Sequence, residues 1–168
     1  MTGEDSGPFA SALRGGIGGF VATVVMTLFR VRIFRALPPP SEFWAQYLGG
    51  GPAEAYRKQG FVLHLSYGST AGGILGSVFP YVDRHSPLGT ETTALLSGAL
   101  YGVVLAVFGD WVIFARVLDR DLEDEHGVVF HVDHVVWGLT LGMWLGERER
   151  RGEVYESPSE GSETAPAR

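Results

Sequence analysis

Apolar residues fall into four long runs that short polar stretches separate. The runs cover about residues 13–29 (or on to 37), 61–82, 92–117 and 128–146. A helix needs about 20 mostly apolar residues to cross the hydrocarbon core of a bilayer. The pattern therefore predicts an all-α, multi-pass protein of the cell membrane with four transmembrane helices. A soluble bundle of buried helices is the alternative.

The two ends of the chain differ from its middle. The stretch after residue 146, ERERRGEVYESPSEGSETAPAR, is charged and rich in Ser, Glu and Pro, and residues 1–10 are similar. Such sequences cannot bury enough apolar area to order themselves. We expect a disordered segment over residues 1–12, a four-helix membrane domain over 13–146 and a disordered acidic tail over 147–168.

The second half of this domain resembles the first. HLSYGSTAGGILG (64–76) matches HVVWGLTLGMWLG (134–146) at a shift of 70, and LRGGIGGFV (13–21) matches LSGALYGVV (96–104) at a shift of 83. Repeat one then covers about 13–82 and repeat two about 92–146. Two helices in each unit return the chain to its starting side. The repeat thus predicts two tandem duplicated helical hairpins, related by a parallel pseudo-twofold along the membrane normal.

Glycine recurs at four-residue spacing within the runs. In lipid, apolar side chains gain nothing by meeting each other, so helices associate where small residues let their backbones approach closely. A ligand against the bare backbone is the other interpretation. We expect helix-packing faces formed by Gly15, Gly19, Gly68, Gly72, Gly76, Gly98, Gly102, Gly138, Gly142 and Gly146.

Five ionisable residues fall toward one end of the predicted helices, and such residues inside a membrane are functional-site candidates by default. They are His64, Asp110, His131, Asp133 and His134. Together they offer nitrogen and oxygen ligands that suit Zn, Fe or Mn. A haem between His64 and His134 is a second candidate. Hydrogen bonding between helices and proton or substrate handling remain open, and Asp110 could instead neutralise Arg116 or an arginine of the first loop.

The first loop, ALPPPSEFWAQYLGGGPAEAYRKQG, carries two further signals. Pro38 to Pro40 are expected to end the first helix and favour an extended backbone. Residues 42–48 are expected to form a short amphipathic turn with Phe43, Trp44 and Tyr47 at the headgroup level. This turn is either an interfacial anchor or a lid over the polar end.

Composition removes several classes of function. The chain has no cysteine, which excludes disulfides and thiolate chemistry, and its formal net charge of -6 argues against a nucleic-acid partner. No phosphate-binding loop, nucleophile elbow or dinucleotide fingerprint is present. We therefore expect a non-enzymatic protein.

The quoted segments HLSYGSTAGGILGSVFP and HVVWGLTLG, with GFVATVVMT (19–27) and ALPPP, resemble small inner-membrane proteins of the YagU-like group and a related family of unknown function. The resemblance covers roughly residues 13–146. It implies a four-helix integral membrane protein with a histidine at the start of the second and fourth helices, and it implies no catalytic residues.

Three functions follow as hypotheses. The first is a small transporter or a membrane-complex subunit, with the lipid bilayer and a second copy of the chain, as a homodimer, as its candidate partners. The second is a membrane protein with a histidine-ligated haem or divalent metal and a redox role. The third is a passive scaffold or stress-related protein whose polar residues only pack.

Overall fold

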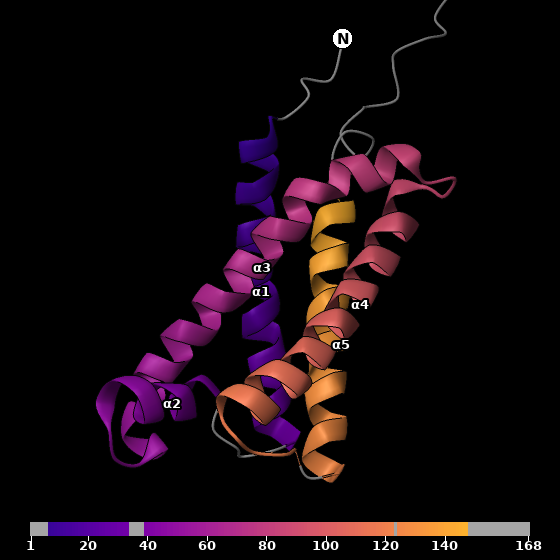
Figure 1. Cartoon of the computed structure of the whole chain (residues 1–168). Helices are drawn as coiled ribbons and strands as arrows, with labels where there is room; N and C mark the ends of the chain where they lie inside the picture. Colours follow the sequence, from indigo (N-terminus) through magenta and orange to yellow (C-terminus); the bar gives the residue numbers. More distant parts are fainter. Residues whose placement is uncertain (1–6, 34–38, 123, 148–168) are drawn as a thin grey trace, which may run out of the picture.

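The computed structural model describes residues 7–33, 39–122 and 124–147, and in these ranges every regular element is a helix (Figure 1). The all-α prediction is confirmed. The elements are α1 (Pro8–Ile33), α2 (Pro39–Trp44), the π-helical η1 (Ala45–Gly49), the 3₁₀ turn η2 (Ala53–Tyr56), α3 (Arg57–His85), α4 (Thr90–Phe108), the π-helical η3 (Gly109–Val117) and α5 (Asp124–Gly146).

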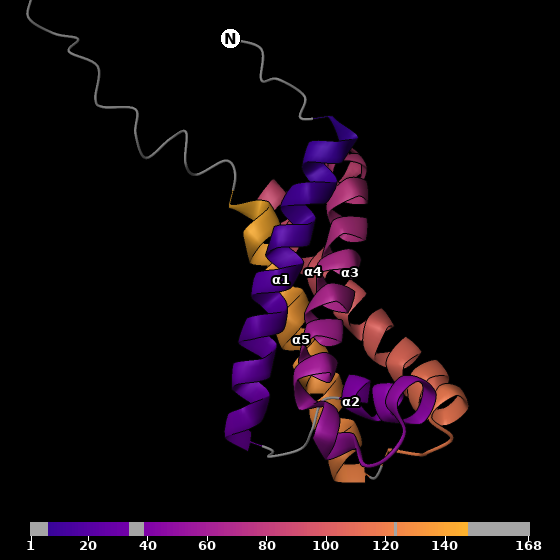
Figure 2. The same cartoon turned by 90° about the vertical axis from the view of Figure 1, so that its left-hand side faces the viewer.

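The four long helices run alternately up and down. The start of α1 and the end of α5 therefore lie at one end of the bundle, and α2 with η1 lies at the other end (Figures 1 and 2). We call this second end the α2 end. It also holds the start of α3, the end of α4 with η3, and the start of α5.

Three segments are long and apolar enough to cross a membrane: Pro8–Val31, Thr90–Val117 and Glu125–Gly146. The sequence predicted four, and the difference is α3. This helix has 29 residues, but glycine and hydroxyl side chains dilute its apolar content. The hydroxyls of Ser66, Thr70 and Ser77 bond to carbonyls of their own helix at 2.7–2.9 Å.

Prolines begin two helices that the sequence analysis bounded differently. Helix α1 starts at Pro8, so residues 8–12 are helical rather than part of a disordered segment. Pro39 and Pro40 stand in the first turn of α2 rather than in extended backbone. Both corrections have one cause, because the fixed φ of proline suits the first helical turn, where its missing N–H leaves no bond unmade.

Glycines form the interface between α1 and α3. A Cβ on Gly15 would come 2.6 Å from the Cα of Gly76, and one on Gly72 would come 2.6 Å from the Cα of Gly19. A Cβ on Gly68 would collide with the hydroxyl of Thr23. The two backbones thus lie closer together than any pair of larger residues allows.

A second glycine interface joins α4 to α5. A Cβ on Gly98 would come 2.9 Å from the Cα of Gly142 and would also meet the carbonyl of Gly138. Gly102 lies against the carbonyl of His134, and Gly146 lies near Ala94. All ten predicted glycines therefore lie against a neighbouring helix.

The two interfaces differ in register. By the sequence repeat, Gly98 corresponds to Gly15 and should meet Gly142 and Gly146. It meets Gly138 and Gly142 instead. The second interface is thus displaced by four residues, or about one helical turn. In these contacts the second hairpin does not reproduce the register of the first.

Helix α5 also packs against α1, and this contact joins the hairpins. Trp137 donates its indole N–H to Thr23 Oγ1 at 3.0 Å and lies 3.3 Å from the carbonyl oxygen of Gly19. Trp144 donates to the carbonyl of Arg14 at 3.1 Å, and the Arg14 guanidinium donates back to the carbonyl of Trp144 at 2.8 Å. The buried core of the bundle includes Trp137 from this contact between α1 and α5. Its residues are Ala22, Met26, Ala71, Leu75, Phe79, Ala94, Trp137, Leu141 and Leu145.

Large apolar side chains also cover the outside of the bundle. Exposed examples occur on each long helix and include Phe9, Leu28, Val62, Tyr81, Leu100, Trp111 and Val128. A water-soluble protein rarely leaves so much apolar area exposed over contiguous faces. The outer surface and the three candidate spans together identify a membrane protein.

Candidate functional site

A cavity of about 270 Å³ lies at the α2 end, between α3 and the last part of α4. Leu63, His64 and Tyr67 line it from α3, and Leu105 with η3 residues lines it from the opposite side. Helices α1, α2 and α5 supply the remaining wall. We call it the α3–α4 cavity. Its full lining is Met26, Arg30, Pro40, Phe43, Leu63, His64, Tyr67, Leu105, Gly109, Ile113, Phe114, Phe130 and His134.

The short helix α2 contributes Pro40 and Phe43 to this cavity. Two polar contacts hold α2 and η1 against the end of η3 and the connection that follows it. Arg120 donates to Glu42 at 2.7 Å, and the Tyr47 hydroxyl donates to the carbonyl of Val117. Ser41 is fully buried and lies against Gly60 of α3. These contacts hold α2 against the cavity.

An ion pair lies beside the cavity. Arg30 near the end of α1 has its Nε 3.7 Å from Oδ2 of Asp133 on α5, and the Asp133 side chain is fully buried. At this distance the pair is not hydrogen bonded, and the Arg30 Nε and both Asp133 oxygens have no hydrogen-bond partner among the described residues. The two charges compensate each other, yet each keeps unused hydrogen-bonding capacity.

Two histidines face the same cavity. His134 is buried, and its Nδ1 lies 2.8 Å from the carbonyl oxygen of Phe130. A carbonyl can only accept, so Nδ1 carries the hydrogen, and Nε2 of the neutral ring is an acceptor with no partner in the described chain. His64 on α3 is half-buried and makes no hydrogen bond to the described residues.

The structure brings only some of the predicted metal ligands together. His64 and His134 line the cavity, and Asp133 lies beside it through Arg30. His131 instead bonds to the carbonyl of Gly127 at 2.9 Å. Asp110 makes no ion pair with the described side chains, and Arg30 pairs with Asp133 rather than with Asp110. Within the described ranges, no three His, Asp or Glu side chains gather as a metal site does.

The sequence analysis missed several residues of the cavity. Arg30 is not among the predicted site residues, although its pairing with a buried carboxylate makes it part of the site. The aromatic residues that line the cavity were not predicted. Two of them are in contact, because Phe130 packs edge-on to Phe114 with 5.2 Å between the ring centroids. Apolar lining residues carry no signal of their own in a chain rich in apolar runs.

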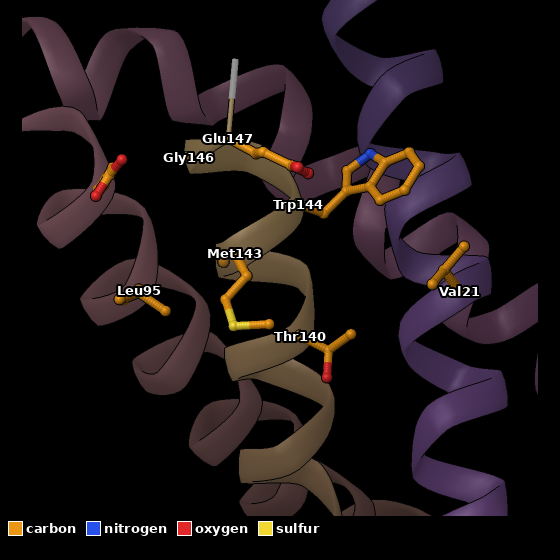
Figure 3. Close-up of a pocket in the computed structure, with 9 residues that line it drawn as sticks. Val21, Leu95, Thr140, Met143, Trp144, Gly146 and Glu147 are labelled. Carbon is orange, nitrogen blue, oxygen red and sulfur yellow. The ribbon is translucent and has the colours of Figure 1, made fainter. Parts of the chain in front are cut away.

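A second cavity, of about 410 Å³, lies at the opposite end of the bundle. Figure 3 shows Trp144 extending from α5 toward α1, with Met143 on α5 and Leu95 on α4. Its charged lining consists of Glu91 and Glu147, near the helix ends. The α3–α4 cavity is the stronger candidate site because polar groups from three helices converge on it and one of them, His134, is buried.

Comparison with known proteins finds no family model, no curated protein and no solved structure that matches the chain. The resemblance to the YagU-like group therefore stays a prediction.

Proposed function

We propose that the protein crosses the cell membrane four times, through α1, α3, α4 and α5, as two duplicated hairpins. We propose further that it holds a small molecule in the α3–α4 cavity and acts as a carrier or as a ligand-binding subunit of a membrane complex, without catalysis. The observation that carries the second proposal is the cavity itself. It is mainly apolar and has a few polar groups at one side, which is typical of small-molecule sites.

Two features support a fourth span. Helix α3 lies along α1 through backbone contacts at three successive glycines, and α1 is itself a candidate span. The hydroxyls of Ser66, Thr70 and Ser77 are satisfied within the helix, which lowers the cost of placing them in lipid. A 29-residue helix is about 44 Å long, more than the hydrocarbon core requires.

The absence of cysteine allows a direct test of topology. Single cysteines at Glu54, Gly89 and Asp121 place one label in each connection, and each residue is exposed. A membrane-impermeant maleimide applied to intact cells should label positions 54 and 121 alike and position 89 oppositely. Labelling of position 89 on the same side as position 54 would show that α3 does not cross.

Binding is tested on protein purified in mild detergent. Native mass spectrometry should detect a small molecule bound to the protein, and Leu63→Trp should remove it by filling the cavity. The control is Val62→Trp, because Val62 is the neighbouring residue on α3 but is 62% exposed. Equal occupancy in the two variants, or none in the unaltered protein, would contradict the proposal.

The second candidate is a haem or divalent metal held by histidine. One observation favours it, because His64 and His134 line one cavity and Nε2 of His134 is free to coordinate. The volume of about 270 Å³ is slightly below the usual range for small-molecule sites, and a haem is a large ligand. A Soret band, or stoichiometric metal that is lost in His64→Ala/His134→Ala, would support this candidate. A protein with neither metal nor ligand would favour the scaffold hypothesis.

A further inference from the structure

The chemistry of the α3–α4 cavity restricts the molecule that it can hold, if the cavity binds a ligand as proposed above. Its charged side chain, Arg30, is already paired with Asp133. An anionic ligand would bring a second negative charge close to this buried carboxylate, and a cationic one would meet the guanidinium. Either charge would also have to leave water for a mainly apolar site, which is costly. The cavity therefore favours a neutral molecule.

Hydrogen-bonding groups at the cavity favour one kind of head group. His134 offers an acceptor, because its only ring hydrogen is donated to the carbonyl of Phe130. The neutral ring of His64 offers one donor and one acceptor. A hydroxyl group can donate to His134 and accept from His64 at the same time. An ether or a carbonyl cannot donate, so it would leave the His134 acceptor unpaired.

The position of the cavity indicates how a ligand reaches it. Helices α3 and α4 are joined at the end opposite α2, where Thr90 bonds to Asp83 at 3.0 Å and Thr93 bonds to Ser86 at 2.8 Å. Toward the α2 end the two helices diverge (Figure 1), and the cavity lies between them. Tyr67 lines the cavity and is 40% exposed, so the cavity reaches the lipid-facing surface.

We infer that the α3–α4 cavity binds a neutral, lipophilic alcohol or phenol that enters from the bilayer, with its hydroxyl group between His64 and His134 and its apolar body against Phe43, Ile113 and Phe114. Phe43 belongs to α2, which the Glu42–Arg120 ion pair holds in place. This inference rests on the proposed ligand-binding function and adds the class of ligand.

The test uses the full chain in liposomes and four photoreactive probes. Each is the same medium-chain alkyl diazirine, ending in a hydroxyl, a methyl ether, a carboxylate or a methyl group. Mass spectrometry locates the labelled residues. The alcohol should label cavity residues saturably, at a half-saturating concentration about fivefold to tenfold lower than the ether, as the loss of one buried hydrogen bond predicts.

Substitutions separate recognition of the hydroxyl from folding. His64→Leu should raise the half-saturating concentration of the alcohol to the value of the ether while leaving labelling by the hydrocarbon probe unchanged. His85→Leu is the matched control on the same helix, because His85 is exposed near its end and bonds to the carbonyl of Tyr81. It should leave all four probes unchanged.

The outcomes distinguish this inference from the proposed function. If no probe labels the cavity saturably, the proposed ligand-binding function fails. If hydrocarbon and alcohol label the cavity equally, the site binds ligands but only as an apolar space, as an acyl chain of a lipid would fill it, and the inference is overturned. Preference for the carboxylate would overturn it as well.

Discussion

Arg30 and Asp133 form an ion pair between two helices that lie 103 positions apart in the chain, with 3.7 Å between Nε and Oδ2. The pair joins the two hairpins at the α2 end, as Trp137 and Thr23 join them further along the same seam. The Asp133 side chain is fully buried, and Arg30 is 15% exposed. A contact of this kind fixes how α1 and α5 are placed against each other.

Removing one member of the pair should destabilise the protein more than removing both. Arg30→Met or Asp133→Leu leaves an uncompensated buried charge, a loss of about 3–5 kcal/mol. The double variant leaves two apolar side chains, so its free energy of unfolding should fall by less than that of either single variant. Unfolding in detergent measures the effect. Glu42→Gln at the more exposed pair with Arg120 should cost at most about 1 kcal/mol. Additive losses would contradict this account.

Gly15→Ala should weaken the α1–α3 interface, because its Cβ would come 2.6 Å from the Cα of Gly76, and backbone cannot yield cheaply. Overpacking of this kind costs about 1–3 kcal/mol. The matched control is Gly16→Ala on the same helix, whose Cβ meets only an ordinary contact at 3.5 Å. Thermal unfolding in one detergent compares them. Equal midpoints would show that the glycine contact does not limit stability.

Thr23→Val should remove the Oγ1 acceptor that Trp137 uses, at nearly constant volume. Hydrogen bonds between membrane helices are worth about 0.6 kcal/mol on average, and the largest about 1.7. The loss should stay in this range because the carbonyl of Gly19 remains 3.3 Å from the indole nitrogen. Thr27→Val is the control, since Thr27 bonds only within α1. In the Trp137→Phe background, Thr23→Val should have little further effect.

Loosening α2 should expose the cavity without unfolding the bundle. The double variant Glu42→Gln/Tyr47→Phe removes the ion pair with Arg120 and the hydrogen bond to the Val117 carbonyl. Hydrogen exchange should then rise over residues 40–49 and stay constant in α4. Glu54→Gln, on the exposed turn η2, serves as the control. Exchange that rises throughout the bundle would indicate a general loss of stability.

Much of the fold could be predicted from the sequence. Long apolar runs have one physical solution in lipid, the helix, because every backbone hydrogen bond must be made inside the segment. Helix limits were less predictable: Pro8 and Pro39 begin helices, although proline also ends them. The π-helical turns at Gly109–Val117 left no pattern, since the apolar run of α4 continues through them.

The candidate site could be predicted only in part. His64 and His134 stood out because polar residues are rare in apolar runs, and both line the cavity. The sequence analysis grouped Asp110 and His131 with these two histidines, but neither residue lines the cavity. Two residues at one end of a bundle can face different sides of their helices. Pairing of Arg30 with Asp133 depends on the rotation of α1 relative to α5, which no local pattern encodes.

The displaced register of the two glycine interfaces has a consequence for how the fold is specified. Small residues repeated every four positions offer several nearly equivalent ways for two helices to slide along each other, so they favour association without selecting one alignment. Selection must come from side chains that fit at a single position. At α4 and α5 that role falls to Phe130, which packs against Gly109 and Phe114. Association and alignment are therefore encoded by different residues and can be altered independently.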